Sequence, residues 1–371
     1  MIIKNAKVYS DGCRFVEKDL IIRDGRIVFG AAPLEGEAVI DADGAYALPG
    51  LVDIHFHGAV GHDFCDADAA GLQAIADFEA SKGVLAICPA TMTFSEEILN
   101  GIMDVAAAHR NERGADLVGI NMEGPFISEK KKGAQNGAYL HAPDAAMFRR
   151  VQAQANGLFK LCDLAPELPG AMQTIEELSG EVRISLAHTE ADYDTACEAF
   201  RRGARQVTHL YNAMPPFSHR APGVIGAAFD SENVAVELIA DGVHIHPSVV
   251  RAVFTLFGGR VILISDSMMA TGLEDGEYSL GGQAVTVRGN LATLHDGTIA
   301  GSATNLMDCV RSAVRMGIPL GQAVRAASTN PARALGIEHD YGSLEAGKLA
   351  NVVLLDDELN IHTILLRGRM L

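Results

Sequence analysis

Side chains that can bind a metal or move a proton lie at the ends of several apolar runs. His55 and His57 end the run that begins at Leu51, and Glu123 ends the run that begins at Leu117. Side chains of a strand alternate between its two faces, so both imidazoles of this HxH pair can bind one ion. A carboxylate directly after a buried run needs a partner, which a metal ion would supply. The pattern favours a metal site, although HxH alone is a weak signal and Glu123 could simply cap the following segment.

The same arrangement recurs later in the chain. His188, His209 and Asp266 each end an apolar run, and His244 follows another. Taken singly, each histidine could be a buried side chain with its hydrogen bonds satisfied. Asp266 follows the most hydrophobic run, and beside a metal it could accept a proton from bound water, whereas a structural carboxylate would need an arginine or a helix N-terminus. Together these residues predict a hydrolytic centre with Asp266 as its base.

The elements that must position these residues alternate between strand and helix. The stretches between apolar runs show the helical period; after Pro247, for example, Val250, Val253, Phe254 and Phe257 share one face. We expect strands at 51–57, 84–91, 117–123, 159–165, 182–188, 206–210, 235–240 and 261–266. Eight such units predict a closed (β/α)8 TIM barrel whose carboxyl-terminal rim gathers the candidate residues. A doubly wound parallel sheet is the structural alternative.

Both ends of the chain show short strand-like segments in place of strand–helix units. Residues 1–50 alternate between apolar and polar side chains, and residues 341–371 return to the same pattern. The fold we predict is therefore α/β. A catalytic barrel spans 51–340, with a β-hairpin insertion near 277–294, and a small β-sandwich domain is built from 1–50 and 341–371.

Composition limits the class of partner. The 371 residues include 30 Lys and Arg against 47 Asp and Glu, a formal net charge of −17. Such a surface repels nucleic acid and anionic membranes, so we expect neither as a partner, and a small anionic ligand would need a local basic pocket. The first residues show no secretory signal, no apolar run approaches the roughly 18 residues of a membrane span, and the six cysteines form no CxxC pair. These features predict a cytoplasmic protein.

Longer motifs carry a resemblance to a known family. The segments PGLVDIHFHG, MEGPF, LAHT, THLYNAMPPFSHRAPG, DGVHIHP and SDSMMATG occur in this order over nearly the whole chain. Together they resemble the N-acetylglucosamine-6-phosphate deacetylases of the amidohydrolase superfamily. HxH recurs across that superfamily, whereas THLYNAM with RxPG, and DGxH followed by SD, are typical of this subgroup. The resemblance implies a metal-dependent barrel with a β-sandwich built from both termini.

The resemblance also implies a set of metal ligands. They are His55, His57, Glu123, His188, His209 and Asp266. In the family pattern Glu123, His188 and His209 form the common site, and the HxH pair holds a second ion that Glu123 bridges. The implied cofactor is one or two divalent ions per chain, and zinc, iron, manganese and cobalt all suit these ligands. Lys160 lies near the start of the fourth strand, which disfavours superfamily branches that bridge their metals with a carbamylated lysine at its end.

Substrate contacts are implied in the same way. The residues concerned are Ala134, Gln135, Asn212, Ala213, Arg220, His244, Ile299, Ala300 and Gly301. Asn212, the Ala213 backbone and Arg220 match phosphate-binding positions, and His244 matches a position that contacts the sugar. Gln135 stands where many relatives have a histidine that contacts the acetamide oxygen. Its amide can still donate a hydrogen bond but carries no charge, and nearby His141 is a speculative substitute.

The activity implied by the resemblance is hydrolysis of the acetamide of N-acetyl-D-glucosamine 6-phosphate, giving D-glucosamine 6-phosphate and acetate in amino-sugar catabolism. Asp266 would take a proton from water and pass it to the departing amine. Three alternatives stay open: the same reaction on the galactosamine epimer, another amidohydrolase that acts on a cyclic amide or a base, and a non-catalytic scaffold. The family also implies a homodimer.

Overall fold

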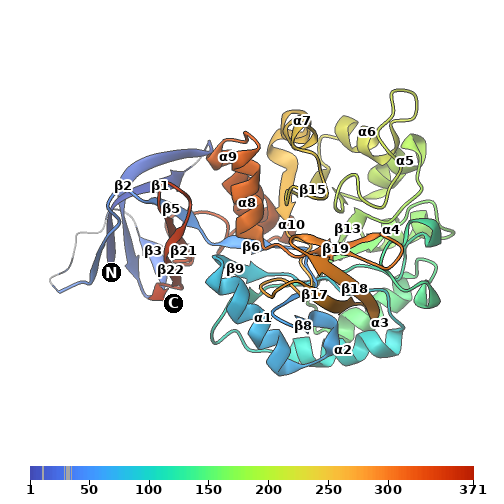
Figure 1. Ribbon diagram of the computed structural model, residues 1–371, viewed down its shortest axis with the longest axis horizontal. Helices are drawn as coiled ribbons and strands as arrows, with labels where there is room; N and C mark the ends of the chain where they lie inside the picture. The colour runs from blue at the N-terminus through green and yellow to red at the C-terminus, as the bar shows by residue number, and fades with distance from the viewer. Residues whose placement is uncertain (11, 29, 31–33, 35) are drawn as a thin grey trace.

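Strands from both ends of the chain pair in one mixed sheet. The computed structural model describes residues 1–10, 12–28, 30, 34 and 36–371. The sheet contains β1 (Ile2–Ser10), β2 (Arg14–Arg23), β3 (Arg26–Val28), β4 (Val39–Asp41), β5 (Tyr46–Pro49), β21 (Val352–Leu355), β22 (Ile361–Leu366) and β23 (Arg369–Met370). Its order is β23-β22-β21-β5-β1-β2-β3, with β4 beside β1, so the antiparallel β5–β21 pair joins the two ends of the chain. Figure 1 shows this unit at one end of the long axis, with both termini in it.

The sheet of the termini curls around its own apolar core. Ile3, Val8, Leu20 and Leu354 are fully buried in this core. At the far edge, the Ile27 N–H donates to the Lys348 carbonyl at 2.9 Å, so β3 returns to the segment that leads into β21. The strands thus belong to one hydrogen-bonded sheet, and the expected two-layer sandwich stays a prediction. Positions 11, 29, 31–33 and 35 of the expected 1–50 segment lie outside the described residues.

Parallel strands and helices alternate through the rest of the chain. The strands are β6 (Leu51–Asp53), β9 (Val84–Ile87), β10 (Asp116–Leu117), β11 (Ile120–Met122), β12 (Phe159–Leu164), β13 (Arg183–Leu186), β14 (Gln206–Val207), β15 (Ala235–Ile239) and β16 (Val261–Ile264). They form two ladders, β10-β9-β6 and β11-β12-β13-β14-β15-β16. The α/β class is confirmed, and each expected range contains a strand. Strand order follows chain order without the reversal of a doubly wound sheet, which argues against that alternative.

The two parallel ladders touch at both of their edges. An isolated parallel bridge joins Ala90, beyond β9, to Asn121 in β11. At the other edge the Asp266 N–H donates to the His55 carbonyl at 2.9 Å, and the His57 N–H donates to the Ser267 carbonyl at 2.7 Å. These contacts bring the carboxyl ends of β6 and β16 together, and with them the residues that follow both strands.

Helices cover the outside of the parallel strands (Figure 1). They are α1 (Ala69–Ser81), α2 (Glu96–Ala108), α3 (Ala145–Gln154), α4 (Ala171–Leu178), α5 (Tyr193–Arg202), α6 (Gly223–Asp230), α7 (Pro247–Phe257), α8 (Leu306–Arg315), α9 (Leu320–Val324) and α10 (Asn330–Leu335), with one π-helical turn at Arg325–Thr329. Asp68, Ser95 and Asp192 accept hydrogen bonds from the first free N–H groups of α1, α2 and α5. Within the described residues, none of the helices combines the length and apolar character needed to cross a membrane.

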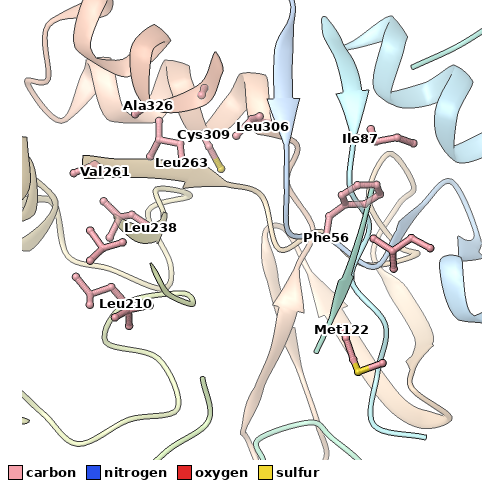
Figure 2. Packing of buried hydrophobic residues seen from close by; sticks show 14 of the residues in the cluster. Phe56, Ile87, Met122, Leu210, Leu238, Val261, Leu263, Leu306, Cys309 and Ala326 are labelled. Carbon is pink, nitrogen blue, oxygen red and sulfur yellow. The ribbon is translucent and has the colours of Figure 1, made fainter. Parts of the chain in front are cut away.

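The main core lies between the helices and the parallel strands. Figure 2 shows Leu263 of β16 near Leu306 and Cys309 of α8, and all three side chains are fully buried. Phe56 belongs to the same core. Because neighbouring side chains of an extended segment point to opposite faces, Phe56 anchors this segment on the helix side and leaves its two histidine neighbours on the other side.

An antiparallel insertion follows β16. It consists of β17 (Gly276–Leu280), β18 (Gln283–Arg288), β19 (Leu291–Thr293) and β20 (Ile299–Ser302), paired in that order. The β-hairpin expected near 277–294 is therefore part of a larger, four-stranded sheet. The polar turn at 295–298 gave no sign in the sequence of the strand that follows it, β20. A shorter pair, β7 (Gly58–Ala59) and β8 (His62–Asp63), and the 3-10 turns at Phe64–Asp66, Glu129–Lys131, Gly137–Tyr139 and Gly258–Arg260 complete the described elements.

Candidate metal centre and substrate pocket

The carboxylate of Glu123 lies among four histidine side chains. Its Oε1 is 3.0 Å from Nε2 of His188, 3.3 Å from Nε2 of His209 and 3.5 Å from Nε2 of His55. Its Oε2 is 3.4 Å from Nε2 of His57. All five side chains are buried. The structure thus brings together residues that follow strands widely separated in the sequence.

Asp266 completes this cluster from the end of β16. Its Oδ1 lies 3.3 Å from Nε2 of His57 and 3.9 Å from Nε2 of His55. The backbone φ is +51° at Asp266, +45° at His188 and +30° at His209, a region that costs a side-chain-bearing residue about 1–3 kcal/mol. Strain at three positions of one cluster is typical of a functional site, and it turns each side chain out of its strand direction.

Gly124 allows the segment after Glu123 to pass close to the loop that follows β9. Its φ is +72°, and a Cβ atom there would lie 2.1 Å from Oγ1 of Thr93. A side chain at this position would push the two segments apart and displace the neighbouring carboxylate.

The spacing of the ligand atoms fits a metal ion. Nε2 of His188 and Nε2 of His209 lie 3.1 Å apart, and each lies within 3.3 Å of Oε1 of Glu123. Ligands bound at about 2.0–2.1 Å around one tetrahedral ion are about 3.3 Å from one another. His55 Nε2 is buried without a hydrogen-bond partner among the described residues, and one candidate ligand group is His55, Glu123 and His209. A second group is His55, His57 and Asp266.

The two carboxylates are stabilised as anions. Burial tends to raise the pKa of Glu123, but the surrounding imidazoles His55, His188 and His209 outweigh it and hold the pKa well below the ordinary value. Burial likewise tends to raise the pKa of Asp266, and the hydrogen bond with His57 leads the effects that lower it. Negative oxygens facing imidazole nitrogens form a donor set that suits a divalent cation.

Hydrogen bonds behind the histidines fix which ring nitrogen is free. Nδ1 of His188 lies 2.7 Å from the Lys131 carbonyl, and Nδ1 of His55 lies 3.1 Å from Oε2 of Glu237. Both oxygens act as acceptors, so each Nδ1 carries the proton and each Nε2 keeps its lone pair for an ion. Sequence analysis missed Glu237, although a glutamate inside the apolar run 235–240 was a signal that a buried carboxylate needs a partner.

A cavity of about 550 Å³ opens over this centre. Of the expected substrate-binding residues, it is lined by Ala134, Gln135, Asn212, Ala213, His244, Ile299 and Gly301. Nδ1 of His244 is 2.8 Å from Oδ2 of Asp241, which fixes the ring at the cavity wall. Burial tends to lower the pKa of His244, but the Asp241 carboxylate raises it above the ordinary value. Sequence analysis also missed Asp241.

Two of the expected substrate contacts, Arg220 and Ala300, lie differently. Arg220 lines a neighbouring cavity with Glu190, and its Nη1 is 2.8 Å from Nε2 of His219. Ala300 is buried in the core of the insertion, because alternation along β20 turns Ile299 and Gly301 toward the cavity and Ala300 away.

Gln135 forms hydrogen bonds to the centre and to the loop beside it. Its amide nitrogen donates to Oε2 of Glu123 at 2.7 Å, and its amide oxygen accepts from the Thr93 N–H at 2.6 Å. Gln135 therefore braces the carboxylate in addition to lining the cavity. His141, the speculative substitute, is exposed, and its Nδ1 lies 2.6 Å from the Ala142 carbonyl, so it does not replace Gln135 at the centre.

The fold and this centre define a class of hydrolase. The amidohydrolase family matches residues 46–371. The chain therefore belongs to the amidohydrolase family, whose members depend on metal ions. Within it, the chain is similar to N-acetylglucosamine-6-phosphate deacetylase from Bacillus subtilis (strain 168), with 38% identity over 346 residues, 91% of this chain and 87% of the relative.

Two further comparisons agree with this assignment. N-acetylgalactosamine-6-phosphate deacetylase from Escherichia coli O157:H7 is 32% identical over 358 residues, 95% of this chain and 94% of the relative. The solved structure of a mutant N-acetyl-D-glucosamine-6-phosphate deacetylase from Mycobacterium smegmatis, in complex with N-acetyl-D-glucosamine-6-phosphate, is similar with a TM-score of 0.92 and 33% identity. The match covers 100% of this chain and 98% of that one.

Proposed function

We propose that this chain hydrolyses the acetamide of N-acetyl-D-glucosamine 6-phosphate to acetate and D-glucosamine 6-phosphate. The observation that carries the proposal is the buried centre of Glu123, its histidines and Asp266 at the base of one cavity. Relatives that match this chain over most of their length bear the name of that activity. We place this reaction in amino-sugar catabolism, the role expected from the sequence.

The fold proposed for this activity is a closed (β/α)8 barrel over 51–340 with a β-sandwich formed by 1–50 and 341–371. The hydrogen bonds that join the ends of β6 and β16 support closure at the rim that carries the centre. The shared sheet of the two termini supports the second unit. The expected homodimer and the cytoplasmic location stay predictions.

The proposed ligands of a divalent ion are Glu123, His188 and His209, with His55, His57 and Asp266 as the set for a second ion. An ion held there lowers the pKa of a water molecule and polarises a carbonyl oxygen. The unpartnered Nε2 of His55, the close approach of Nε2 of His188 and His209 to Glu123, and the two ionised carboxylates support this assignment.

Proton transfer and positioning of the substrate are assigned to residues of the chain. Oδ1 of Asp266 accepts the proton of the attacking water and donates it to the amine nitrogen as the C–N bond breaks. The Glu123 carboxylate, braced by Gln135, stays in place during this transfer. His244, fixed by Asp241, orients the sugar hydroxyls, and Asn212 and Ala213 line the same cavity. Holding the sugar in this way makes the attack effectively intramolecular.

The galactosamine epimer is the second candidate substrate, favoured by the relative named for that activity. The two sugars differ at one hydroxyl, and either fits the same chemistry. The test is acetate release from both 6-phosphates, with the amine product identified by NMR. A higher kcat/KM for the gluco epimer supports the first proposal, a higher value for the galacto epimer replaces it by the second, and release from neither rejects both.

A further inference from the structure

We propose that the ammonium groups of Lys131 and Lys132 bind the phosphate of the substrate. This inference rests on the proposed function and adds residues to it that the family resemblance did not supply. It starts from a run of three lysines, Lys130, Lys131 and Lys132, all of which line the cavity over the metal centre. A charge run is most often a solvated surface, so its place in this wall needs an explanation.

Hydrogen bonds tie the lysine segment to the metal centre. The Ser128 N–H donates to the His188 carbonyl at 2.9 Å, and Nδ1 of His188 donates to the Lys131 carbonyl at 2.7 Å. Thr189, which directly follows His188, extends this network, because its N–H donates to the Ala213 carbonyl at 3.0 Å. The lysines are therefore held beside the Ala213 segment, where the phosphate-binding positions of the family were expected.

The lysines differ in the partners of their ammonium groups. Nζ of Lys130 is 3.3 Å from Oε2 of Glu190, and its side chain is 79% exposed. Lys131 and Lys132 are half-buried, and within the described residues their side chains have no acidic partner or hydrogen bond. Two cations held in a cavity wall without an ion-pair partner form a site that an anion would complete.

The acidic lining of the cavity explains why a phosphate would need such cations. Glu123, Glu129 and Asp266 line it, in a chain of formal net charge −17, so an incoming phosphate dianion meets a repulsive field. Arg220, the cation expected to offset this field, lies in the neighbouring cavity. Glu190 contacts both basic regions. It pairs with Lys130 and it also lines the cavity of Arg220. Within the described residues, the lysines are the only cationic side chains other than histidine that line the catalytic cavity.

The test measures binding by calorimetry, with glucosamine 6-phosphate and unphosphorylated glucosamine as probes and metal-loaded protein throughout. The test variant combines Lys131→Met and Lys132→Met, which keeps the apolar stems and removes both charges. Lys82→Met is the matched control, because Lys82 is also half-buried, lies 5.2 Å over the Phe78 ring and does not line the cavity. A second variant combines Lys131→Arg and Lys132→Arg and keeps both charges.

The proposal predicts that the Met variant weakens glucosamine 6-phosphate binding by roughly tenfold or more, the effect of losing a charge-assisted hydrogen bond. The Arg variant and the control stay within about threefold of the parent, and glucosamine binding does not change in any of them. Equal phosphate-dependent binding by the parent and the Met variant would overturn the proposal, and so would a parent that binds both probes equally. Acetate release by the parent is measured separately, so failure of the proposed reaction is visible apart from failure of the lysine site.

Discussion

Oε2 of Glu237 lies 3.1 Å from Nδ1 of His55, and both side chains are fully buried. Oε1 of the same carboxylate accepts from Nε2 of Gln206 at 2.5 Å. Because both neighbours donate, Glu237 holds the His55 proton on Nδ1 and leaves Nε2 toward Glu123. A residue inside β15 thereby orients a candidate metal ligand that follows β6 on the other ladder.

Glu237→Gln should reduce metal retention. The new amide has one donor atom, its nitrogen, which would face either His55 or Gln206. Both of these residues donate to Glu237, so the hydrogen bond that holds the His55 proton on Nδ1 and leaves its Nε2 free is lost. Changes to a residue that orients a metal-binding histidine typically cost about 10–100-fold in metal affinity. The measurement is metal content per chain after dialysis against graded chelator. The control is Glu198→Gln, a half-buried glutamate of α5 that pairs with Arg201 and Arg202. Retention equal to that of the parent at every chelator concentration would refute the role.

Asp266→Asn should lower kcat by about 10²–10⁴-fold, because the amide cannot accept the proton of the attacking water. Asparagine tolerates the positive φ of this position, so the variant keeps its backbone. Steady-state kinetics gives kcat, and calorimetry with glucosamine 6-phosphate checks that the product still binds within about threefold. A variant with near-normal kcat would show that another group moves the proton.

Gln135→Leu should lower the free energy of unfolding by about 1–3 kcal/mol, since it leaves buried polar groups of Glu123 and Thr93 without their partner. Urea unfolding at fixed metal concentration measures the change. Gln283→Leu is a useful comparison, because Gln283 also bonds to the cavity loop, at the Ala134 carbonyl, but leaves no buried carboxylate unpaired. An unchanged midpoint for Gln135→Leu would show that water replaces its amide at no cost.

Glu79 should make stability fall as pH rises. It lies in α1 with both carboxylate oxygens buried and unpartnered among the described residues, and burial raises its pKa well above the ordinary value, with Asp53 adding to the rise. Below about pH 4.3 the folded and unfolded chains both hold the proton. Above that pH the unfolded chain releases the proton while the folded chain keeps it. The free energy of unfolding therefore falls by up to about 1.4 kcal/mol per pH unit until the pH reaches the pKa of the folded chain.

Glu79→Gln removes this titration and keeps the shape of the side chain. Its free energy of unfolding should therefore exceed that of the parent by more at pH 8 than at pH 4. Urea unfolding at both pH values gives the two differences. The same difference at both values would mean that the pKa of Glu79 does not differ between the folded and unfolded chains.

The positions of the candidate metal ligands could be predicted because each one ends an apolar run, a local feature of the sequence. His188, His209 and Asp266 were placed at strand ends in this way, although the strands stop two to three residues earlier than expected. The difference has a physical cause, because these residues adopt positive φ and leave the ladder.

Contacts that depend on loop paths could not be predicted. Arg220 lies in an irregular segment between β14 and α6, where no periodicity tells which cavity its side chain enters. Nothing in the sequence around the lysine run shows which surface it faces, and the hydrogen bonds between Ser128, His188 and Lys131 place it in the cavity wall. Spacing along the chain carries no record of such long-range contacts.

The most direct test of the proposed activity is the rate of acetate release from N-acetylglucosamine 6-phosphate as metal is added back to chelator-treated protein. Rate and bound metal are measured on the same samples. The proposal predicts a negligible rate without metal, and a rise in proportion to bound ion that stops when the sites formed by Glu123, His188, His209 and their neighbours are filled. Full activity without bound metal, or no acetate from fully loaded protein, would contradict it.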